Sequence, residues 1–426
     1  MSTTRFAQAD DQSHGGNAPP RDPRLRLLLK IAGQIRVGAL TVVMPDGATH
    51  RLGASAVPAA TVVIRDPRAV TRLVTGGSLG WAEAYLDALW ESPDIRAVMA
   101  LAAANEAQLT PLLRGRSWTR ALAWIAHKLR PNTRRGASRN IVAHYDLGNA
   151  FYRLWLDASM TYSSAVFAEP AEALEVAQAR KMRLLCERLG LRPGMRVLEI
   201  GCGWGGFATL AAREFGVQVV GLTLSPSQLE FARARIVEAG LSDRVELRLQ
   251  DYRDVPGQFD RIASIEMFEA VGREYWPSYF RTVHDRLAPG GLAGIQTITI
   301  DDTWFDDYAR TADFIQRHVF PGGMLPSPGE LRREVAMAGL EWRGDHWFGL
   351  DYAETLARWY GDFQRAWPQV ARLPPPAGKQ PYDARFKRLW EYYLAYCEIG
   401  FRARWTDVGQ LILARPGRPI PVRRPP

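Results

Sequence analysis

Short apolar runs alternate with amphipathic segments from about residue 170 onward. Residues 176–190 and 225–240 have helical periodicity, and residues 195–201, 217–224, 245–251 and 259–266 have the composition of strands. Strands that alternate with helices form parallel sheets with helices on both faces. The pattern therefore predicts an α/β fold with a doubly wound, mostly parallel sheet.

The first part of the chain has a different pattern. Residues 34–44 and 60–66 are rich in β-branched side chains, and a turn at Pro45-Asp46-Gly47 lies between them. Residues 70–90 and 94–113 then have helical periodicity. We expect a smaller α+β domain here, because a chain of 426 residues exceeds one core of ordinary size.

Basic residues are concentrated in two places. The formal net charge is +9, and no acidic residue occurs between Ala107 and Tyr145. The basic residues of this window are Arg114, Arg116, Arg120, Lys128, Arg130, Arg134, Arg135 and Arg139, and the Pro-rich tail adds Arg415, Arg418, Arg423 and Arg424. Such clusters favour an anionic partner, either phospholipid headgroups or nucleic acid.

Residues 112–130 have the pattern of a basic amphipathic helix, with Trp118, Leu122 and Ile125 on one face. One interpretation is a solvated face that packs on its own domain. The other is a helix that lies on a membrane surface, which the combination of tryptophan and undiluted basic charge favours.

Cysteine usage and hydropathy indicate the compartment. The three cysteines, Cys186, Cys202 and Cys397, lie far apart, and none has the spacing of a zinc site. Neither a signal-peptide core nor an uncharged apolar run of about 18 residues is present. We expect a cytoplasmic protein without bound metal or a membrane span, peripherally associated with the inner face of the membrane.

A glycine-rich loop follows the first strand of the alternating region. Residues 197–208, VLEIGCGWGGFA, match G-x-G-x-x-G through Gly201, Gly203 and Gly206. Glycines at these positions let the backbone approach a ligand and direct helix amides toward it. The motif is shared by sites for dinucleotides and for S-adenosylmethionine, and a tight turn without a ligand is the alternative.

Three details favour S-adenosylmethionine. The loop comes after a long helical prelude, whereas many dinucleotide domains begin with theirs. About 20 residues on, where a dinucleotide site needs an acid for the ribose, the sequence GLTLSPSQ has only Thr223 and Gln228 as polar groups for a ligand. Asp251 and Tyr252 follow the third strand, where they suit an adenine ring. These features predict a class I methyltransferase core.

Two segments have unusual compositions. Residues 144–167, HYDLGNAFYRLWLDASMTYSSAVF, combine many aromatic rings with polar side chains that would need partners if buried. Residues 262–272, IASIEMFEAVG, place Glu266 and Glu269 three residues apart in apolar surroundings, on roughly one face of a helical turn. A carboxylate in such surroundings is costly unless it is paired or used.

These motifs together resemble a known family. HYDLGNAFYRLWLD, VLEIGCGWGGFATLA, VVGLTLSPSQ, LQDYRDV, MFEAVG, FPGGMLPS and EYYLAYCEIGFRAR occur in the order seen in cyclopropane-fatty-acyl-phospholipid synthases. The resemblance extends from about residue 140 to 414, and the related mycolic acid cyclopropane synthases share it. It implies transfer of a methyl group from S-adenosylmethionine to the double bond of an unsaturated acyl chain of a membrane phospholipid, followed by ring closure.

The resemblance also implies a site. Methylation of an alkene leaves a carbocation, for which Tyr145 and Tyr162 could supply π-faces. In the family a bound bicarbonate acts as the base, held by a Glu, a His, a Tyr and two backbone amides. The corresponding positions here are Glu269, Gln296, Tyr393, Ser164 and Ile298. We expect the cofactor to contact Tyr162, Ser163, Gly201, Cys202, Gly203, Thr223, Leu224, Gln228, Asp251 and Tyr252.

Three positions depart from the family pattern. Ser164 replaces a common Cys, which matters little if the position contributes a backbone amide. Gln296 replaces the His of an HTI motif, and Gln can hydrogen-bond but cannot titrate. Ala270 replaces the His of FEH. The role of Glu266 stays open between orienting the site, contacting the cofactor and a structural role.

Several functions therefore remain possible. The first prediction is cyclopropane formation, and the second is a methyl- or methylene-branched product, which could require a partner reductase. A non-catalytic lipid-binding protein and a methyltransferase with another acceptor are lesser alternatives. We expect no nucleic-acid partner, because no Pro-Pro-type tetrad follows the fourth strand. A homodimer is possible.

The expected organisation has five parts. These are a disordered lead-in (1–25), a small α+β domain with the basic helix (26–130), a linker (131–140), an S-adenosylmethionine-dependent catalytic domain (141–414) and a basic Pro-rich tail (415–426).

Overall fold

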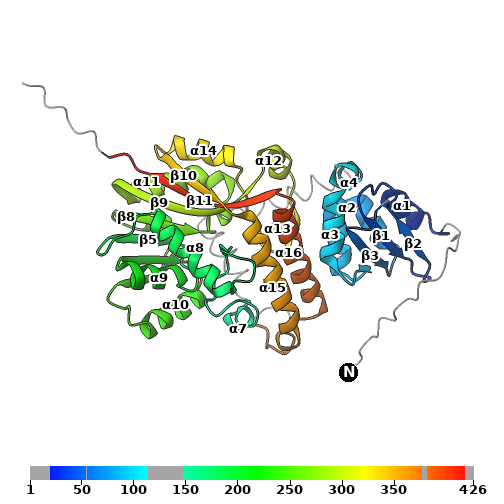
Figure 1. Cartoon of the computed structure of the whole chain (residues 1–426), viewed down its shortest axis with the longest axis horizontal. Helices are drawn as coiled ribbons and strands as arrows, with labels where there is room; N and C mark the ends of the chain where they lie inside the picture. The colour runs from blue at the N-terminus through cyan, green and yellow to red at the C-terminus, as the bar shows by residue number, and fades with distance from the viewer. Residues whose placement is uncertain (1–19, 54, 114–146, 377–380, 418–426) are drawn as a thin grey trace, which may run out of the picture. The chain divides into compact units, whose positions relative to one another are not determined.

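A computed structural model describes residues 20–53, 55–113, 147–376 and 381–417 (Figure 1). The chain divides into two compact units, Met1–Arg114 and Gly115–Pro426. The predicted linker and all but the first two residues of the predicted basic helix lie outside the described residues. The boundaries at residues 130 and 140 therefore stay predictions.

The N-terminal unit contains a four-stranded sheet of order β2-β1-β3-β4, in which β1 and β3 are parallel. Its strands are β1 (Ala39–Val43), β2 (Thr49–Leu52), β3 (Ala59–Ile64) and β4 (Trp90–Glu91). Its helices are α1 (Pro23–Ala32), α2 (Arg68–Leu86), α3 (Ile95–Ala104) and α4 (Glu106–Leu113). Helix α1 begins at Pro23, inside the predicted lead-in of residues 1–25. The smaller α+β unit predicted from the sequence is confirmed.

The predicted helix over residues 94–113 is wrong in one respect, since it is two helices. Asn105 lies between α3 and α4 and is fully buried. Its side-chain oxygen accepts hydrogen bonds from the amides of Arg36 and Val37 at 2.7 and 2.9 Å, and its Nδ2 donates to the Val37 carbonyl at 2.7 Å. These bonds cap the backbone of a neighbouring segment. A tertiary contact therefore explains the break, which periodicity alone does not show.

The second unit contains a seven-stranded sheet of order β10-β11-β9-β8-β5-β6-β7. Strands β5 to β9 are mutually parallel where they pair, and β11 runs antiparallel to β9 and β10. The strands are β5 (Arg196–Ile200), β6 (Gln218–Thr223), β7 (Val245–Leu249), β8 (Phe259–Ile265), β9 (Leu287–Ile300), β10 (Glu341–Trp347) and β11 (Thr406–Ala414). The predicted class I methyltransferase sheet is confirmed.

Helices cover both faces of this sheet. They are α7 (Asn149–Tyr152), α8 (Leu174–Arg188), α9 (Gly206–Phe215), α10 (Pro226–Glu238), α11 (Trp276–Arg286), α12 (Asp302–Ala309), α13 (Phe314–His318), α14 (Pro328–Met337), α15 (Gly349–Val370) and α16 (Ala384–Arg402). Short 3₁₀ turns are η1 (Tyr252–Asp254), η2 (Phe268–Ala270) and η3 (Arg273–Tyr275).

The alternation of side chains along β5 produces two separate cores. Val197 packs in a cluster with residues of α8, α9 and α10, whereas Leu198 and Ile200 pack in a cluster with residues of α11 and α14. Successive strand residues point to opposite faces, so a sheet covered on both sides needs apolar residues throughout. This explains the nearly continuous apolar run that identified the strand.

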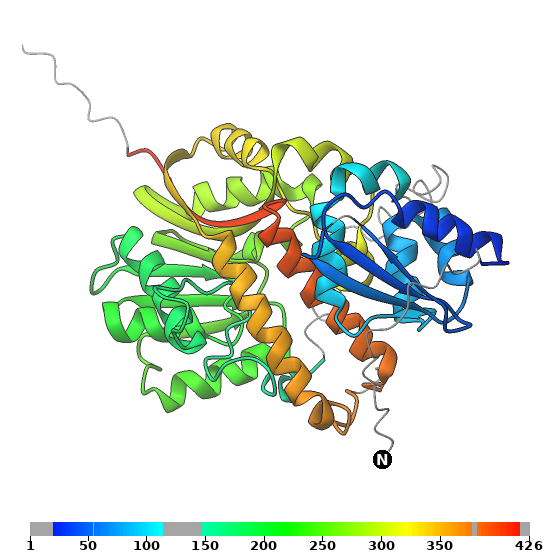
Figure 2. The same ribbon diagram turned by 45° about the vertical axis from the view of Figure 1, so that its right-hand side comes forward.

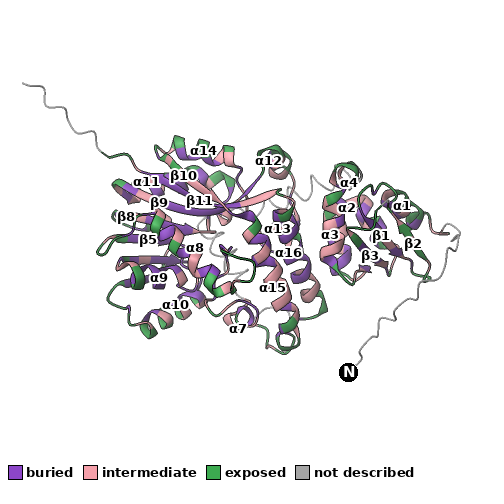
Figure 3. Ribbon diagram, in the orientation of Figure 1, coloured by how far each residue is buried: buried purple, intermediate pink, exposed green. Residues whose placement is uncertain are grey.

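Two long helices, α15 and α16, lie side by side in the second unit (Figures 1 and 2). Each has a buried stripe along one side, whereas most residues of the other side are half-buried (Figure 3). The buried stripes carry large rings, among them Trp359, Trp390 and Tyr393. Of these rings, Trp359 packs against Tyr162, which lines the pocket described below. Among the described residues, no helix is both long enough and apolar enough to cross a membrane.

Candidate functional site

The glycine loop joins the end of β5 to the start of α9. Gly201, Gly203 and Gly205 all have positive φ, a conformation that other residues rarely adopt. A Cβ at Gly201 would lie 2.8 Å from the Met267 side chain, so this position also lacks room for a larger residue. The loop therefore leaves its backbone close to the space beside it.

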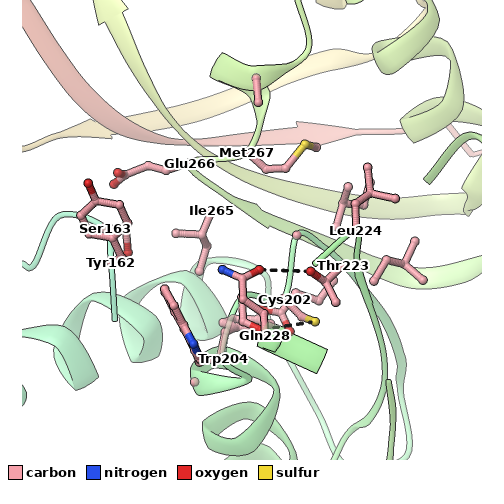
Figure 4. Close-up of a pocket in the computed structure, with 18 of the residues that line it drawn as sticks. Tyr162, Ser163, Cys202, Trp204, Thr223, Leu224, Gln228, Ile265, Glu266 and Met267 are labelled. Atoms are coloured by element: carbon pink, nitrogen blue, oxygen red, sulfur yellow. Dashed lines mark hydrogen bonds between the residues drawn. The ribbon is translucent and has the colours of Figure 1, made fainter. Parts of the chain in front are cut away.

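That space is a pocket at the carboxyl ends of β5, β6 and β8, with about 1200 Å³ of free volume when its open mouth is counted. Ligands of open α/β sheets bind at this edge. The pocket is lined by every residue predicted to contact the cofactor: Tyr162, Ser163, Gly201, Cys202, Gly203, Thr223, Leu224, Gln228, Asp251 and Tyr252. The structure thus brings the predicted set together. Figure 4 labels part of the set, namely Tyr162, Ser163, Cys202, Thr223, Leu224 and Gln228.

Polar groups of the pocket are held by their own neighbours. Thr223 Oγ1 donates to Gln228 Oε1 at 3.1 Å, drawn as a dashed line in Figure 4. The Asp251 carboxylate is bidentate with Arg253, whose Nε and Nη2 lie 2.8 and 2.6 Å from its oxygens. Arg253 also lines the pocket and was not predicted. Its side chain orients the acid that was expected near the adenine.

Glu199, at the end of β5, lines the pocket as well. It is buried, and within the described part of the chain its Oε2 has no hydrogen-bond partner. Burial raises its pKa to about 8, while Lys181 acts to lower it. An unpartnered buried carboxylate oxygen fits the amino group or the sulfonium of S-adenosylmethionine, because either cation would compensate its charge. The residues present therefore fit this group.

Glu266 directly follows β8 and has a positive φ of 48°. The amide of Ser164 and Nε2 of Gln296 donate to its Oε1 at 2.9 and 2.8 Å. The Tyr352 hydroxyl donates to its Oε2 at 2.7 Å. Glu266 lines the pocket beside Met267, and Figure 4 shows its carboxylate on the side of Tyr162 and Ser163.

Glu269 lies in η2 and is not among the residues that line the pocket. Its Oε1 accepts from the Ile298 amide at 2.5 Å and from Thr297 Oγ1 at 3.0 Å. Within the described residues its Oε2 is buried without a partner. Burial, followed by the charge of Glu266, raises the pKa of Glu269 to about 8.

The expectation that Glu266 and Glu269 share one face of a helical turn is wrong. Only Glu269 belongs to a helical turn, and Glu266 precedes it with left-handed backbone. The two carboxylates therefore reach different donors, Glu266 toward the segment of Ser164 and Glu269 toward β9. Spacing alone does not reveal a reversal of the backbone at the end of a strand.

The residues predicted to hold a bicarbonate together do not form one site in the structure. Gln296 and the Ser164 amide bind Glu266, whereas the Ile298 amide binds Glu269. The Tyr393 hydroxyl lies 2.8 Å from that of Tyr162 instead of at either carboxylate. Tyr145 lies outside the described residues.

Lys181 was missed by the sequence reasoning. It is fully buried in α8, lines the pocket, and its Nζ donates to Ser163 Oγ. Burial lowers its pKa to about 8, and Glu266, Asp157 and Glu199 act to raise it. Its spacing of four from the buried Ala177 and Leu185 was the available signal.

Tyr352 and Gln410 also belong to the site and were not predicted, because no motif or spacing near either residue indicates such a role. Gln410 lies in β11, where its Nε2 donates to Gln296 Oε1 at 3.2 Å and to the Lys181 carbonyl at 3.0 Å. It therefore holds the Gln296 amide with its nitrogen toward Glu266. Tyr352 reaches Glu266 from α15 across 86 residues of sequence.

Aromatic rings surround Tyr162. Its ring centroid is 5.5, 5.7 and 5.2 Å from those of Tyr152, Trp155 and Trp359. Trp204 of the glycine loop lies 5.1 Å from Tyr152, and its Nε1 donates to Asn149 at 2.8 Å. The aromatic segment predicted to serve the site therefore forms a cluster of rings, of which Tyr162 lines the pocket together with Trp204.

The sheet topology, the glycine loop and the pocket define an S-adenosylmethionine-dependent methyltransferase of class I. The family model described as mycolic acid cyclopropane synthetase matches residues 132–411. The chain belongs to this family, and the family predicted from the motifs is confirmed.

Two curated relatives are similar over most of the chain. Tuberculostearic acid methyltransferase UfaA1 of Mycobacterium tuberculosis is 37% identical over 418 residues, which cover 92% of this chain and 91% of the relative. Cyclopropane-fatty-acyl-phospholipid synthase of Escherichia coli is 37% identical over 370 residues, 84% of this chain and 88% of the relative. The family thus includes cyclopropane synthases and a tuberculostearic acid methyltransferase. This protein is a fatty-acid methyltransferase of that family.

A solved structure shows the same fold. Mycolic acid cyclopropane synthase CmaA1, complexed with SAH and CTAB, has 31% identity and a TM-score of 0.60. The match covers 65% of this chain and 98% of that one.

Proposed function

We propose that the protein transfers a methyl group from S-adenosylmethionine to the double bond of an unsaturated acyl chain of a membrane phospholipid, and that loss of a proton then closes a cyclopropane ring. One observation carries this proposal. The half-buried, hydrogen-bonded carboxylate of Glu266 lines the pocket of the methyl donor together with the aromatic rings of Tyr162 and Trp204. A base and π-faces without water are what a carbocation formed from an alkene requires.

The residues of the pocket have distinct roles in this proposal. S-adenosylmethionine supplies an electrophilic methyl group on a sulfonium. Glu199 compensates the positive charge of the donor, and Thr223, Gln228 and the Arg253-oriented Asp251 bind its polar groups. Tyr162 and Trp204, whose rings line the pocket, stabilise positive charge on the acyl chain, each contributing on the order of 1–2 kcal/mol in a dry site.

A branched product is the second candidate. If a hydride shift precedes the proton loss, the same cation gives a methylene branch in place of a ring, and a reductase partner would convert it to a methyl branch. Gln296 favours this candidate, because Gln410 locks its amide and an amide does not titrate, so proton removal differs from that of a His-containing site. The likeness to a relative named for tuberculostearic acid agrees with it.

A bound bicarbonate stays a prediction. The resemblance implies that bicarbonate accepts hydrogen bonds from the Ser164 amide and from Gln296. In the structure both of these groups donate to the carboxylate of Glu266 instead.

Membrane docking rests on charge. The basic window between residues 107 and 145 would lie on anionic lipid, with about 1 kcal/mol contributed by each basic residue near the surface. In this proposal the protein is cytoplasmic and associates peripherally with the inner face of the membrane. Reversing the charges of Arg134 and Arg135 should weaken binding to anionic vesicles at low salt, and unchanged binding would remove the docking proposal.

A homodimer remains a proposal that gel filtration can test.

The reaction is tested with purified protein, donor labelled in its methyl group, and vesicles of unsaturated phospholipid. We expect label in the lipid, with a mass gain of one CH₂ group. NMR distinguishes a ring from a methylene branch. Label in a polar acceptor or in RNA, with none in the lipid, would reject the proposed function.

A further inference from the structure

The backbone at Glu266 is strained. Its φ of 48° lies in the left-handed region, which costs a non-glycine residue on the order of 1 kcal/mol or more. Such strain persists only where the surroundings hold it, and it is concentrated at functional positions. The strain has a visible effect here, because it turns the carboxylate away from the line of β8 and toward the segment of Ser163 and Ser164.

Three segments far apart in sequence hold the carboxylate. The Ser164 amide, Gln296 of β9 and Tyr352 of α15 donate to its two oxygens. Oε1 accepts two of these hydrogen bonds and Oε2 accepts one, so Oε2 keeps a further lone pair. The donors stabilise a negative charge, and the cationic Lys181 does the same from α8.

The surroundings of Glu266 and Glu269 act differently on the pKa values of the two carboxyl groups. Burial raises the pKa of Glu266, but Lys181, Tyr352, Ser164 and Gln296 all act to lower it. For Glu269, burial and the nearby Glu266 both raise the pKa. Where the surroundings shift the pKa values of two neighbouring carboxyl groups apart, one group acts as the acid and the other as the base. Glu266 is the member whose carboxylate accepts three hydrogen bonds and that lines the pocket.

We propose that the carboxylate of Glu266 is the proton acceptor of the reaction, so that no dissociable anion is needed. This inference rests on the proposed function. The alkene π-pair forms the new C–C bond as the S–CH₃ bond breaks, which leaves a neutral thioether and a carbocation. Oε2 then takes a proton from the transferred methyl carbon. The electrons of that C–H bond close the ring, or form a methylene double bond if a hydride has shifted. Overall, one sulfonium charge is exchanged for one proton.

The geometry also predicts a rescue. In Glu266→Gly the backbone strain disappears, because glycine adopts positive φ without penalty. The donors on Ser164, Gln296 and Tyr352 would then face a space of the size of a small carboxylate. Added bicarbonate or acetate should occupy that space, whereas Glu266→Gln fills it with an amide that accepts protons poorly.

The experiment compares wild type, Glu266→Gln and Glu266→Gly in the labelled-lipid assay, in buffer purged of CO₂ and with added bicarbonate or acetate. We expect wild-type turnover to be unaffected by bicarbonate. We expect a loss of at least 100-fold in both variants, as for removal of a general base. Glu266→Gly should regain at least 10-fold with the added anion, and Glu266→Gln should not. Glu274→Gln, an exposed glutamate in η3, is the matched control.

Each outcome decides between specific claims. Wild-type turnover that needs bicarbonate, or Glu266→Gln within a few-fold of wild type, would overturn the inference and leave the proposed function intact. Absence of label from the lipid with wild-type protein would reject the proposed function and this inference together. Binding of S-adenosylhomocysteine by calorimetry shows whether each variant is folded. If neither variant folds, the bicarbonate dependence of the wild type alone decides.

Discussion

Glu266 and Glu269 are three residues apart, yet their surroundings differ in almost every physical respect. Glu266 borders the pocket, accepts hydrogen bonds from three donors and lies within the field of Lys181. Glu269 does not line the pocket; the Met324 amide donates to its backbone carbonyl at 2.8 Å, and one of its carboxyl oxygens is unpartnered among the described residues. The donors and the neighbouring charges of Glu266 favour its ionised form, whereas the nearby charge of Glu266 acts against ionisation of Glu269.

The largest expected effect contrasts the two residues directly. Glu266→Gln should lower kcat at least 100-fold, whereas Glu269→Gln should lower it about 10-fold or less, because an amide resembles a protonated acid. The measurement is kcat for lipid methylation, with donor affinity measured separately. An equal or greater loss at Glu269 would favour the sequence-derived prediction that Glu269 anchors the base.

The next effect tests the role of Lys181. Lys181→Met removes a cation that favours the ionised form of Glu266, so the pKa of Glu266 should rise. At pH 7 we expect kcat to fall about 10- to 100-fold, and the acidic limb of the pH profile to move upward by one unit or more. Raising the pH should therefore restore activity to the variant.

Lys387→Met, in a partly exposed lysine of α16 that pairs with Glu391, is the control for this substitution. It should leave the pH profile unchanged. A loss at Lys181 that is the same at every pH would show a structural role only.

A third effect concerns stability. The folded-state pKa of Glu269, about 8, lies above its ordinary value of 4.5. The folded state therefore binds this proton more tightly, and its contribution to stability, present below pH 4.5, is lost as the pH rises through 8. Glu269→Gln should remove this loss, by on the order of 1–3 kcal/mol.

Denaturant unfolding of wild type and Glu269→Gln at pH 5 and pH 8.5 measures the effect. If the two proteins show the same pH dependence, Glu269 is ionised in the folded state and the division of charge described above is wrong.

The smallest effect is that of Tyr352→Phe. Loss of one hydrogen bond to the carboxylate, worth about 1–2 kcal/mol, should move the acidic limb of the kcat profile upward by less than Lys181→Met does. Tyr382→Phe loses a hydroxyl that donates to the Leu147 carbonyl and is the matched control. It should cost similar stability without moving the pH profile.

The core of the fold was predictable because its signals are local. Apolar runs at β5, β6, β7 and β8 and the glycine loop after β5 depend on strand burial and on backbone freedom, which neighbouring residues set. The polar residues around the loop were placed correctly in one pocket for the same reason, since parallel strands end at one edge of a sheet. The break at Asn105 was not predictable, because its cause is a contact with residues 36 and 37.

The same distinction between local signals and tertiary contacts applies to the site of the proposed base. The sequence by itself determined that two carboxylates lie in apolar surroundings near a methyl-donor pocket, because motif, spacing and composition show it. Only the tertiary structure decided which of them receives Ser164, Gln296, Tyr352 and Lys181. These residues come from segments up to 188 residues apart (Ser164 and Tyr352), each of which donates to or attracts the same carboxylate. Such convergence depends on how sheet and helices pack, and no local pattern encodes it.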